Sequence, residues 1–236
     1  NLHTALYMVT TDTELNQIAS FFPGAMSEAR NIELDPIMDK TGVFDLVIIS
    51  PDDPDAMLRH TELCRTRGIP FAADPSQQMA RMDGDAIKQL IDGATYLFMN
   101  EYELALAIQK TGWSDSEILN RVKTRVVTLG SNGAQVERSG HEKVIVGVPQ
   151  EEAKIDPTGV GDSFRSGFLA GVAWGLSEER CAQLGSMIAT YVIETKGTQE
   201  YRFTRETFLN RFQTAYGDVA AADIAAHLAR ITTAPQ

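Results

Sequence analysis

The chain has 236 residues, 43% of them hydrophobic, which is enough to bury the core of one α/β domain over residues 1–236. Its formal net charge of −11, with no block of basic residues, argues against nucleic acid as a partner, because phosphate backbones are bound by grouped cations. The longest weakly polar run, residues 167–176, is shorter than the roughly 20 residues of a membrane-spanning helix, so we expect no membrane contact. Cys64 and Cys181 are isolated in the sequence, so we expect a cytoplasmic protein with no disulfide framework and no zinc site.

Short β-rich runs dominate the first half of the chain. A strand-like run opens it at residues 5–11, and four apolar runs follow at residues 44–50, 69–73, 95–99 and 125–130. The four runs lack polar alternation, as is typical of strands buried on both faces of a sheet. Helical segments follow the first three of them, and this order predicts an α/β fold with a doubly wound, mostly parallel sheet flanked by helices.

The carboxyl ends of these four runs are small or polar: Ser50, Asp74, Asn100 and Gly130. Ligands of open parallel sheets bind in the crevice beyond the strand ends, so the pattern predicts a binding site there. The alternative is that these residues are polar simply because they begin loops.

The second half of the chain predicts short antiparallel strands before residue 155 and helices from about Asp162 and over 177–194, 204–215 and 220–230. One face of the helix that starts near Asp162 carries a small residue at every fourth position: Ser163, Gly167, Gly171 and Gly175. Three glycines would weaken a helix by about 2 to 3 kcal/mol relative to alanines. We therefore expect a neighbouring element or ligand to approach this face closely.

The stretch IDPTGVGDSFRSGF, residues 155–168, places glycines and an aspartate where that helix begins. Glycine allows backbone angles closed to other residues, so the N–H groups of Gly159, Val160 and Gly161 can turn inward around an anion, helped by the helix dipole. Asp162 beside them can take a proton from an attacking hydroxyl as a general base. These groups are the minimum equipment for phosphoryl transfer to an alcohol. The alternative is a glycine turn in which Asp162 caps the helix.

Other glycine-based motifs are missing from the sequence, which has no GxxxxGK[ST], no third glycine of a dinucleotide fingerprint and no GxSxG. Residues 156–171, DPTGVGDSFRSGFLAG, instead resemble the carboxy-terminal signature D[TP]xGAGD of the ribokinase-like (PfkB) carbohydrate and nucleoside kinases. Val160 replaces the more usual alanine, a departure that should not disturb a site built from backbone amides. The resemblance implies that Asp162 is the catalytic base and that the amides of residues 159–161 hold the γ-phosphate of ATP.

Asn100 and Glu103 have two interpretations. Their spacing at the start of a helix predicts a capping box. The resemblance implies an NxxE motif that holds Mg²⁺ through water, and both can be true because a carboxylate in the first turn can also face the crevice.

Residues 126–136, VVTLGSNGAQV, resemble the family's TLGxxG turn, which implies nucleotide contacts for Thr128, Gly130 and Gly133; the alternative is an ordinary hairpin. Residues 196–201, KGTQEY, resemble the segment beside the adenine and a monovalent cation. Asp156 and Thr158 are then candidates for a K⁺ site.

Two further features lie close to these motifs. Asp74 and Pro75 match a DP pair that related kinases carry near the phosphates, and a plain turn is the alternative. Arg165, one helical turn after Asp162, could steady a phosphate, and the alternative is a solvated or ion-paired arginine.

The resemblance spans about residues 5–216 and is strongest to the bacterial adenosine kinase branch. It implies an ATP-dependent kinase that phosphorylates a primary hydroxyl, above all the 5′-hydroxyl of adenosine. A sugar kinase for ribose or fructose is the alternative within the enzymes, and a non-catalytic nucleoside- or sugar-binding relative is the alternative outside them. The family's amino-terminal GG motif, sugar-binding aspartate and β lid are not recognised, so we expect the substrate and lid segment to be missing from the chain as given; the alternative is a shortened relative. Many relatives dimerise through that lid, which makes a homodimer a further expectation.

Overall fold

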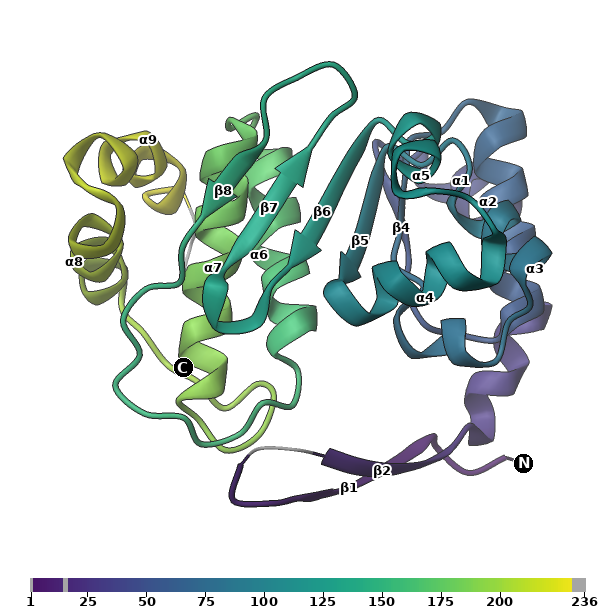
Figure 1. Ribbon diagram of the computed structural model, residues 1–236, viewed down its shortest axis with the longest axis horizontal. Coiled ribbons are helices and arrows are strands. Elements are labelled where there is room, and N and C mark those ends of the chain that lie inside the picture. Colours follow the sequence, from purple (N-terminus) through teal and green to yellow (C-terminus); the bar gives the residue numbers. More distant parts are fainter. Residues whose placement is uncertain (1, 15–16, 231–236) are drawn as a thin grey trace. The chain divides into compact units, whose positions relative to one another are not determined.

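The computed structural model describes residues 2–14 and 17–230, which form two compact units (Figure 1). The first unit comprises Asn1–Val127 with Glu137–Glu142, and the second comprises Thr128–Val136 with Lys143–Gln236. We describe each unit by itself. The expectation of a single domain stays a prediction.

Four strands of the first unit follow chain order. They are β3 (Val47–Ile49), β4 (Phe71–Ala73), β5 (Tyr96–Asn100) and β6 (Thr124–Thr128). The pairs β3–β4 and β4–β5 are parallel, with Val47 opposite Phe71 and Ala72 opposite Tyr96. The strands predicted from the apolar runs are confirmed, although β3 covers only the last part of the run at 44–50.

Helices follow the first three of these strands, as the sequence predicts. They are α2 (Pro54–Arg67), α3 (Gly84–Ile91) and α4 (Glu101–Thr111), with a short 3-10 turn η2 (Ser76–Ala80) before α3 and a further helix α5 (Asp115–Arg121) after α4. In α2, Asp53 accepts a hydrogen bond from the N–H of Ala56, which satisfies one free donor at the helix start. Gly68 ends the same helix in the left-handed conformation, with φ of 66°. Local capping residues therefore set both ends of α2.

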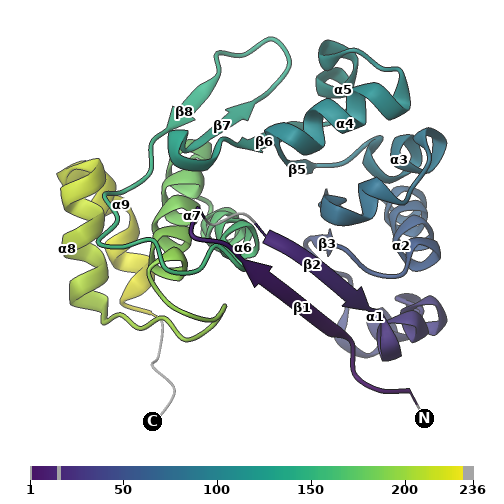
Figure 2. The same cartoon turned by 60° about the horizontal axis from the view of Figure 1, so that its bottom comes forward.

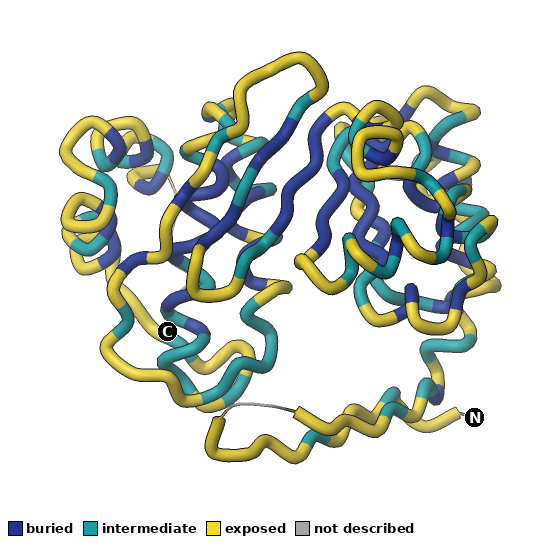
Figure 3. The backbone as a smooth tube through the Cα atoms, in the orientation of Figure 1, coloured by how far each residue is buried: buried dark blue, intermediate teal, exposed yellow. Residues whose placement is uncertain are grey.

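The central strands of the first unit are buried (Figure 3). All three residues of β4 and the three central residues of β5 are buried, which explains why these runs show no polar alternation. Side chains from the helices complete the core, among them Met57, Ile87, Leu90 and Ile118.

An antiparallel pair of strands precedes this sheet: β1 (Leu6–Thr11) and β2 (Gln17–Phe22), with Leu6 opposite Phe22 (Figure 2). The strand predicted at the start of the chain is thus confirmed, whereas its partner was not predicted. Apolar side chains on both strands are exposed, Ile18 to 82%. A 3-10 segment η1 (Gly24–Asn31) and helix α1 (Asp35–Thr41) lead from this pair to β3.

The second unit contains strands β7 (Ala134–Glu137) and β8 (Val144–Val146) and helices α6 (Val160–Ala173), α7 (Glu178–Ile193), α8 (Arg205–Tyr216) and α9 (Asp218–Leu228). The strands are antiparallel, and the last three helices agree with the predicted ranges within a few residues. Residue 137 at the end of β7 is counted in the first unit. Within residues 2–14 and 17–230, no helix is both long and apolar enough to cross a bilayer.

Helices α6 and α7 pack closely at the predicted glycine face. A Cβ atom added to Gly167 would lie 2.7 Å from the carbonyl oxygen of Leu184, and one added to Gly171 would lie 2.9 Å from the Cα of Cys181. Gly185 of α7 meets α6 in the same way. The expected close approach is therefore confirmed at Gly167 and Gly171, and the neighbouring element is α7.

Two details of this region differ from the sequence-based expectation. Helix α6 begins at Val160 rather than near Asp162, because Gly159 in a left-handed conformation already turns the chain into the helix. Gly175 does not belong to the packing face. It follows the end of α6 with φ of +72°, and no atom lies within 4 Å of an added Cβ, so it serves the turn into α7.

Candidate active site

The start of α6 contains backbone N–H groups that have no backbone acceptor among the described residues. The N–H of Val160 makes a long bond of 3.3 Å to the carbonyl of Pro157, and the N–H of Ser163 donates to Gly159 at 2.9 Å. The part of the chain that the structure describes offers no acceptor to the N–H groups of Gly159, Gly161 or Asp162. The N–H groups of Gly159 and Gly161 are thus open to a ligand, that of Val160 is partly engaged and that of Asp162 is a further candidate, and an anion site here stays a prediction.

Both the backbone angle at position 159 and the limited space around it require glycine. Its φ is +82°, and a Cβ at this position would lie 2.9 Å from the Cγ2 of Thr198. The segment 196–201 therefore lies against the glycine loop. No pattern in the sequence itself indicated this contact, and the place of the segment beside adenine and a monovalent cation stays a prediction.

Asp156 joins the two loops. Its Oδ1 accepts the N–H of Thr158 at 3.0 Å, and its Oδ2 accepts the N–H of Gly197 at 3.2 Å. Hydrogen bonds from Thr158, from its side chain first, and from Gly197 hold the pKa of the Asp156 carboxyl below its ordinary value. An ionised Asp156 therefore braces the glycine loop, and its role at a K⁺ site, with Thr158, stays a prediction.

Asp162 extends into solvent, with 77% of its side chain exposed. Its Oδ1 lies 2.5 Å from Nη2 of Arg165, so the ion-paired alternative for this arginine is the one observed. Residue 162 does not turn into the core. A carboxylate in this position is open to a hydroxyl group that approaches from solvent.

Asn100 and Glu103 form the predicted capping box at the start of α4 in the first unit. The N–H of Asn100 donates to Oε2 of Glu103, and the N–H of Glu103 donates to Oδ1 of Asn100, both at 2.8 Å. Among residues 2–14 and 17–230 there is no group of three or more His, Cys, Asp or Glu side chains that could hold a metal ion. One carboxylate that contacts Mg²⁺ through water, with phosphates as the main ligands, is compatible with this donor set.

Thr128 ends β6, and a tight turn follows it. Gly130 begins a 3-10 turn with φ of +57°, and the N–H of Leu129 donates to the carbonyl of Gly133 at 2.8 Å. A Cβ on Gly133 would lie 1.9 Å from the carbonyl oxygen of Val146 in β8. Close packing against β8 is therefore enough to explain why residue 133 is glycine. Nucleotide contacts of Thr128, Gly130 and Gly133 stay predictions.

Asp74 is fully buried at the end of β4, and its N–H donates to the carbonyl of Ile49 at 2.9 Å. Pro75 leads directly into the 3-10 turn η2. The turn interpretation of this pair is therefore observed.

The sequence did not indicate an ion pair that fastens the segment at residues 150–152 to helices α7 and α8. Arg211 of α8 pairs with Glu194 at the end of α7, 2.5 Å apart, and also donates to the carbonyl of Gln150 at 2.8 Å. Glu194 accepts the N–H of Glu152 at 2.7 Å. Burial opposes ionisation of Glu194, but the hydrogen bonds from Arg211 and Glu152 outweigh it and lower the pKa of its carboxyl.

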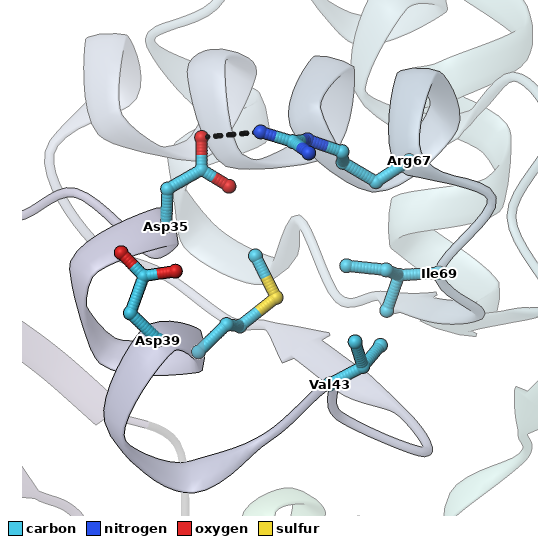
Figure 4. Close-up of a pocket in the computed structure, with 6 residues that line it drawn as sticks. Asp35, Asp39, Val43, Arg67 and Ile69 are labelled. Atoms are coloured by element: carbon cyan, nitrogen blue, oxygen red, sulfur yellow. Dashed lines mark hydrogen bonds and ion pairs between the residues drawn. The ribbon is translucent and has the colours of Figure 1, made fainter.

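A separate hollow lies in the first unit, with a volume of about 410 Å³ (Figure 4). It is lined by Asp35, Met38, Asp39, Val43, Arg67 and Ile69. Arg67 pairs with Asp35 at 3.0 Å on one side of it. None of the predicted site residues lines this hollow.

The comparison with known proteins gives a consistent result. A nucleoside kinase of Methanocaldococcus jannaschii is 29% identical over 205 residues, which are 87% of this chain and 66% of that protein, so the chain spans just under two thirds of the relative's length. The structure of Burkholderia thailandensis nucleoside kinase in complex with inosine is similar with a TM-score of 0.86 and 35% identity, over 92% of this chain and 72% of that one. The same enzyme in complex with ADP-inosine gives a TM-score of 0.85 at 35% identity, over 92% of this chain and 67% of that one.

The family model for the pfkB family carbohydrate kinases matches residues 1–204. Every residue that the sequence predicts for the active site lies within this range. The chain therefore belongs to the pfkB family of carbohydrate kinases.

Proposed function

We propose that this protein is an ATP-dependent kinase that transfers the γ-phosphoryl group to the 5′-hydroxyl of adenosine. The observation that carries the proposal is the start of α6, where unengaged N–H groups lie beside the exposed carboxylate of Asp162. The similarity to a nucleoside kinase whose structure contains inosine and ADP supports a nucleoside acceptor and ATP as the donor.

In this mechanism the proton of the acceptor hydroxyl passes to the carboxylate of Asp162 as the oxygen attacks the γ-phosphorus. The bond between that phosphorus and the bridging oxygen breaks, and ADP leaves with the electron pair. The N–H groups of Gly159 and Gly161, the more weakly available one of Val160, and the positive end of α6 stabilise the charge on the phosphoryl oxygens. In this proposal the amides and the helix terminus stabilise the phosphoryl oxygens, and Asp162 takes the proton of the acceptor.

Mg²⁺ supplies positive charge to the phosphates when bound, and we assign Glu103 as the carboxylate that contacts it through water. Asp156 and Thr158 are assigned to K⁺, while Asn100, Thr128, Gly130 and Gly133 are assigned to the nucleotide side. A cytoplasmic location and a homodimer complete the proposal. The location is supported by Cys64 and Cys181, which are both buried free thiols.

The acceptor is tested by incubating the purified protein with ATP and Mg²⁺ and following ADP release with adenosine, inosine, ribose or fructose. We expect adenosine to give the highest kcat/KM, and inosine to be a slower nucleoside substrate. Faster release with ribose or fructose would identify a sugar kinase instead. Tight adenosine binding by calorimetry without any ADP release would identify a non-catalytic binding protein.

A further inference from the structure

Arg165 occupies an unusual position within α6. Its Nη2 contacts the carboxylate of Asp162, and its Nη1 lies 3.3 Å from the place where a Cβ of residue 161 would be. The guanidinium therefore lies between the candidate base and the backbone of Gly161, whose N–H finds no acceptor in the described chain. Only 14% of the Arg165 side chain is exposed.

An ordinary ion pair on a helix surface would not require this placement. Pairs of exposed side chains three residues apart contribute little to stability and are screened by salt. Arg165 is instead largely buried, and it is the only Lys or Arg between residues 155 and 179 of an acidic chain. Its position next to the glycine loop brings a guanidinium to the place where a phosphate would bind.

We propose that Arg165 is a positioning residue that is shared between Asp162 and the terminal phosphate of ATP. Before phosphate binds, the guanidinium holds the Asp162 carboxylate beside the amides and offsets its repulsion of an approaching anion. When Asp162 accepts the proton of the acceptor hydroxyl, the carboxyl becomes neutral and its attraction for Arg165 falls. The guanidinium has five N–H donors, so it also donates to the oxygens of the terminal phosphate as ATP binds, and this contact strengthens as the carboxyl is neutralised. This inference rests on the proposed kinase function.

The test compares two ligands that differ only in the terminal phosphate: ADP and the non-hydrolysable β,γ-imido analogue of ATP, each with Mg²⁺. In Arg165→Met, which keeps the apolar stem and removes the charge, calorimetry should show the Kd of the analogue rising about tenfold while the Kd of ADP stays within about twofold. The kcat for ADP release should fall at least about tenfold. Arg165→Lys keeps the charge without the fork and should restore part of both losses.

Arg180 supplies a matched control in the same unit. Its side chain is 15% exposed, and its Nε pairs with Asp223 at 2.9 Å, far along the chain from the glycine loop. Arg180→Met should lower the thermal midpoint without changing the ratio of the two Kd values. If Arg165→Met also leaves this ratio and kcat unchanged, Arg165 is only a structural partner of Asp162 and the inference is wrong.

The same measurements separate this inference from the proposed function. A wild-type protein that binds the analogue and releases ADP with adenosine, together with an unchanged ratio in Arg165→Met, would overturn the inference alone. A wild-type protein that binds neither ligand would overturn both. If circular dichroism shows that Arg165→Met does not fold, Arg165→Lys replaces it in the test. A ratio of the two Kd values and a kcat equal to those of the wild type would then show that the planar guanidinium is not needed, and the inference would be wrong.

Discussion

At the scale of single residues, the geometry around Asp162 argues against the helix-cap alternative. A cap would turn its side chain back onto the N–H groups of its own helix. Asp162 does not; its side chain is exposed and contacts Arg165, and the N–H of the preceding Gly161 has no backbone acceptor in the described part of the chain. With capping excluded, the role of Asp162 as the catalytic base stays a prediction.

A conservative change at this residue tests the mechanism. Asp162→Asn keeps the size of the side chain but cannot take the acceptor's proton, so kcat should fall by about 100-fold or more while the Kd of ADP stays within about twofold. ADP release and calorimetry measure the two quantities. Asp218→Asn, at the exposed start of α9, is the matched control and should leave both unchanged. Near-normal turnover by Asp162→Asn would reject the assignment.

At the scale of elements, the pair α6–α7 explains the glycine pattern. Glycine costs helix stability in water, and it is retained here because the two backbones approach too closely for a Cβ atom. The close packing holds the start of α6, and with it the free N–H groups, against a rigid partner. Helix propensity and packing therefore oppose each other at these positions, and packing prevails.

Gly167→Ala measures which effect is larger. Alanine should gain about 1 kcal/mol of helix propensity, but its Cβ would lie 2.7 Å from a backbone carbonyl, and relieving such overpacking costs about 1 to 3 kcal/mol or more. We therefore expect a net loss in the free energy of unfolding, measured by urea denaturation. Gly147→Ala is the control, because no atom lies within 4 Å of its added Cβ. A stabilised Gly167→Ala would show that the helices can move apart at little cost.

At the scale of the whole molecule, acid stability should depend on carboxylates that ionise more readily in the folded state. Glu194 is one of them, since the hydrogen bonds from Arg211 and Glu152 outweigh its burial and lower its pKa. A group with a lowered folded pKa stabilises the protein above its unfolded pKa of about 4.3 and loses this contribution as the pH falls through the folded value.

The variant Glu194→Gln isolates this contribution. At pH 7 it should be less stable than the wild type by about 1 to 3 kcal/mol, because Arg211 loses its charged partner. The difference should shrink as the pH falls from about 5 to 3, where the wild-type carboxyl becomes protonated and resembles the amide. Urea unfolding at a series of pH values measures it. A difference that stays constant down to pH 3 would contradict this account.

The sequence by itself determined the features that depend on neighbours along the chain. The buried strands, the helices, the capping box of Asn100 with Glu103 and the glycine loop before Asp162 all follow from periodicity or from contacts a few residues apart. Even there α6 begins at Val160, two residues before the expected start, because Gly159 turns the chain into the helix with a left-handed angle that the sequence allows but does not require.

Only the tertiary structure decided which distant groups meet. Asp156 accepts a hydrogen bond from Gly197, and Arg211 reaches Glu194 and Gln150, although these partners lie 17 to 61 residues apart in the chain. The glycine face of α6 was visible in the sequence, but its partner α7 and the different purpose of Gly175 were not. The physical reason is that capping and periodicity are local, whereas the choice of a packing partner or a bridging carboxylate depends on how the whole chain closes on itself.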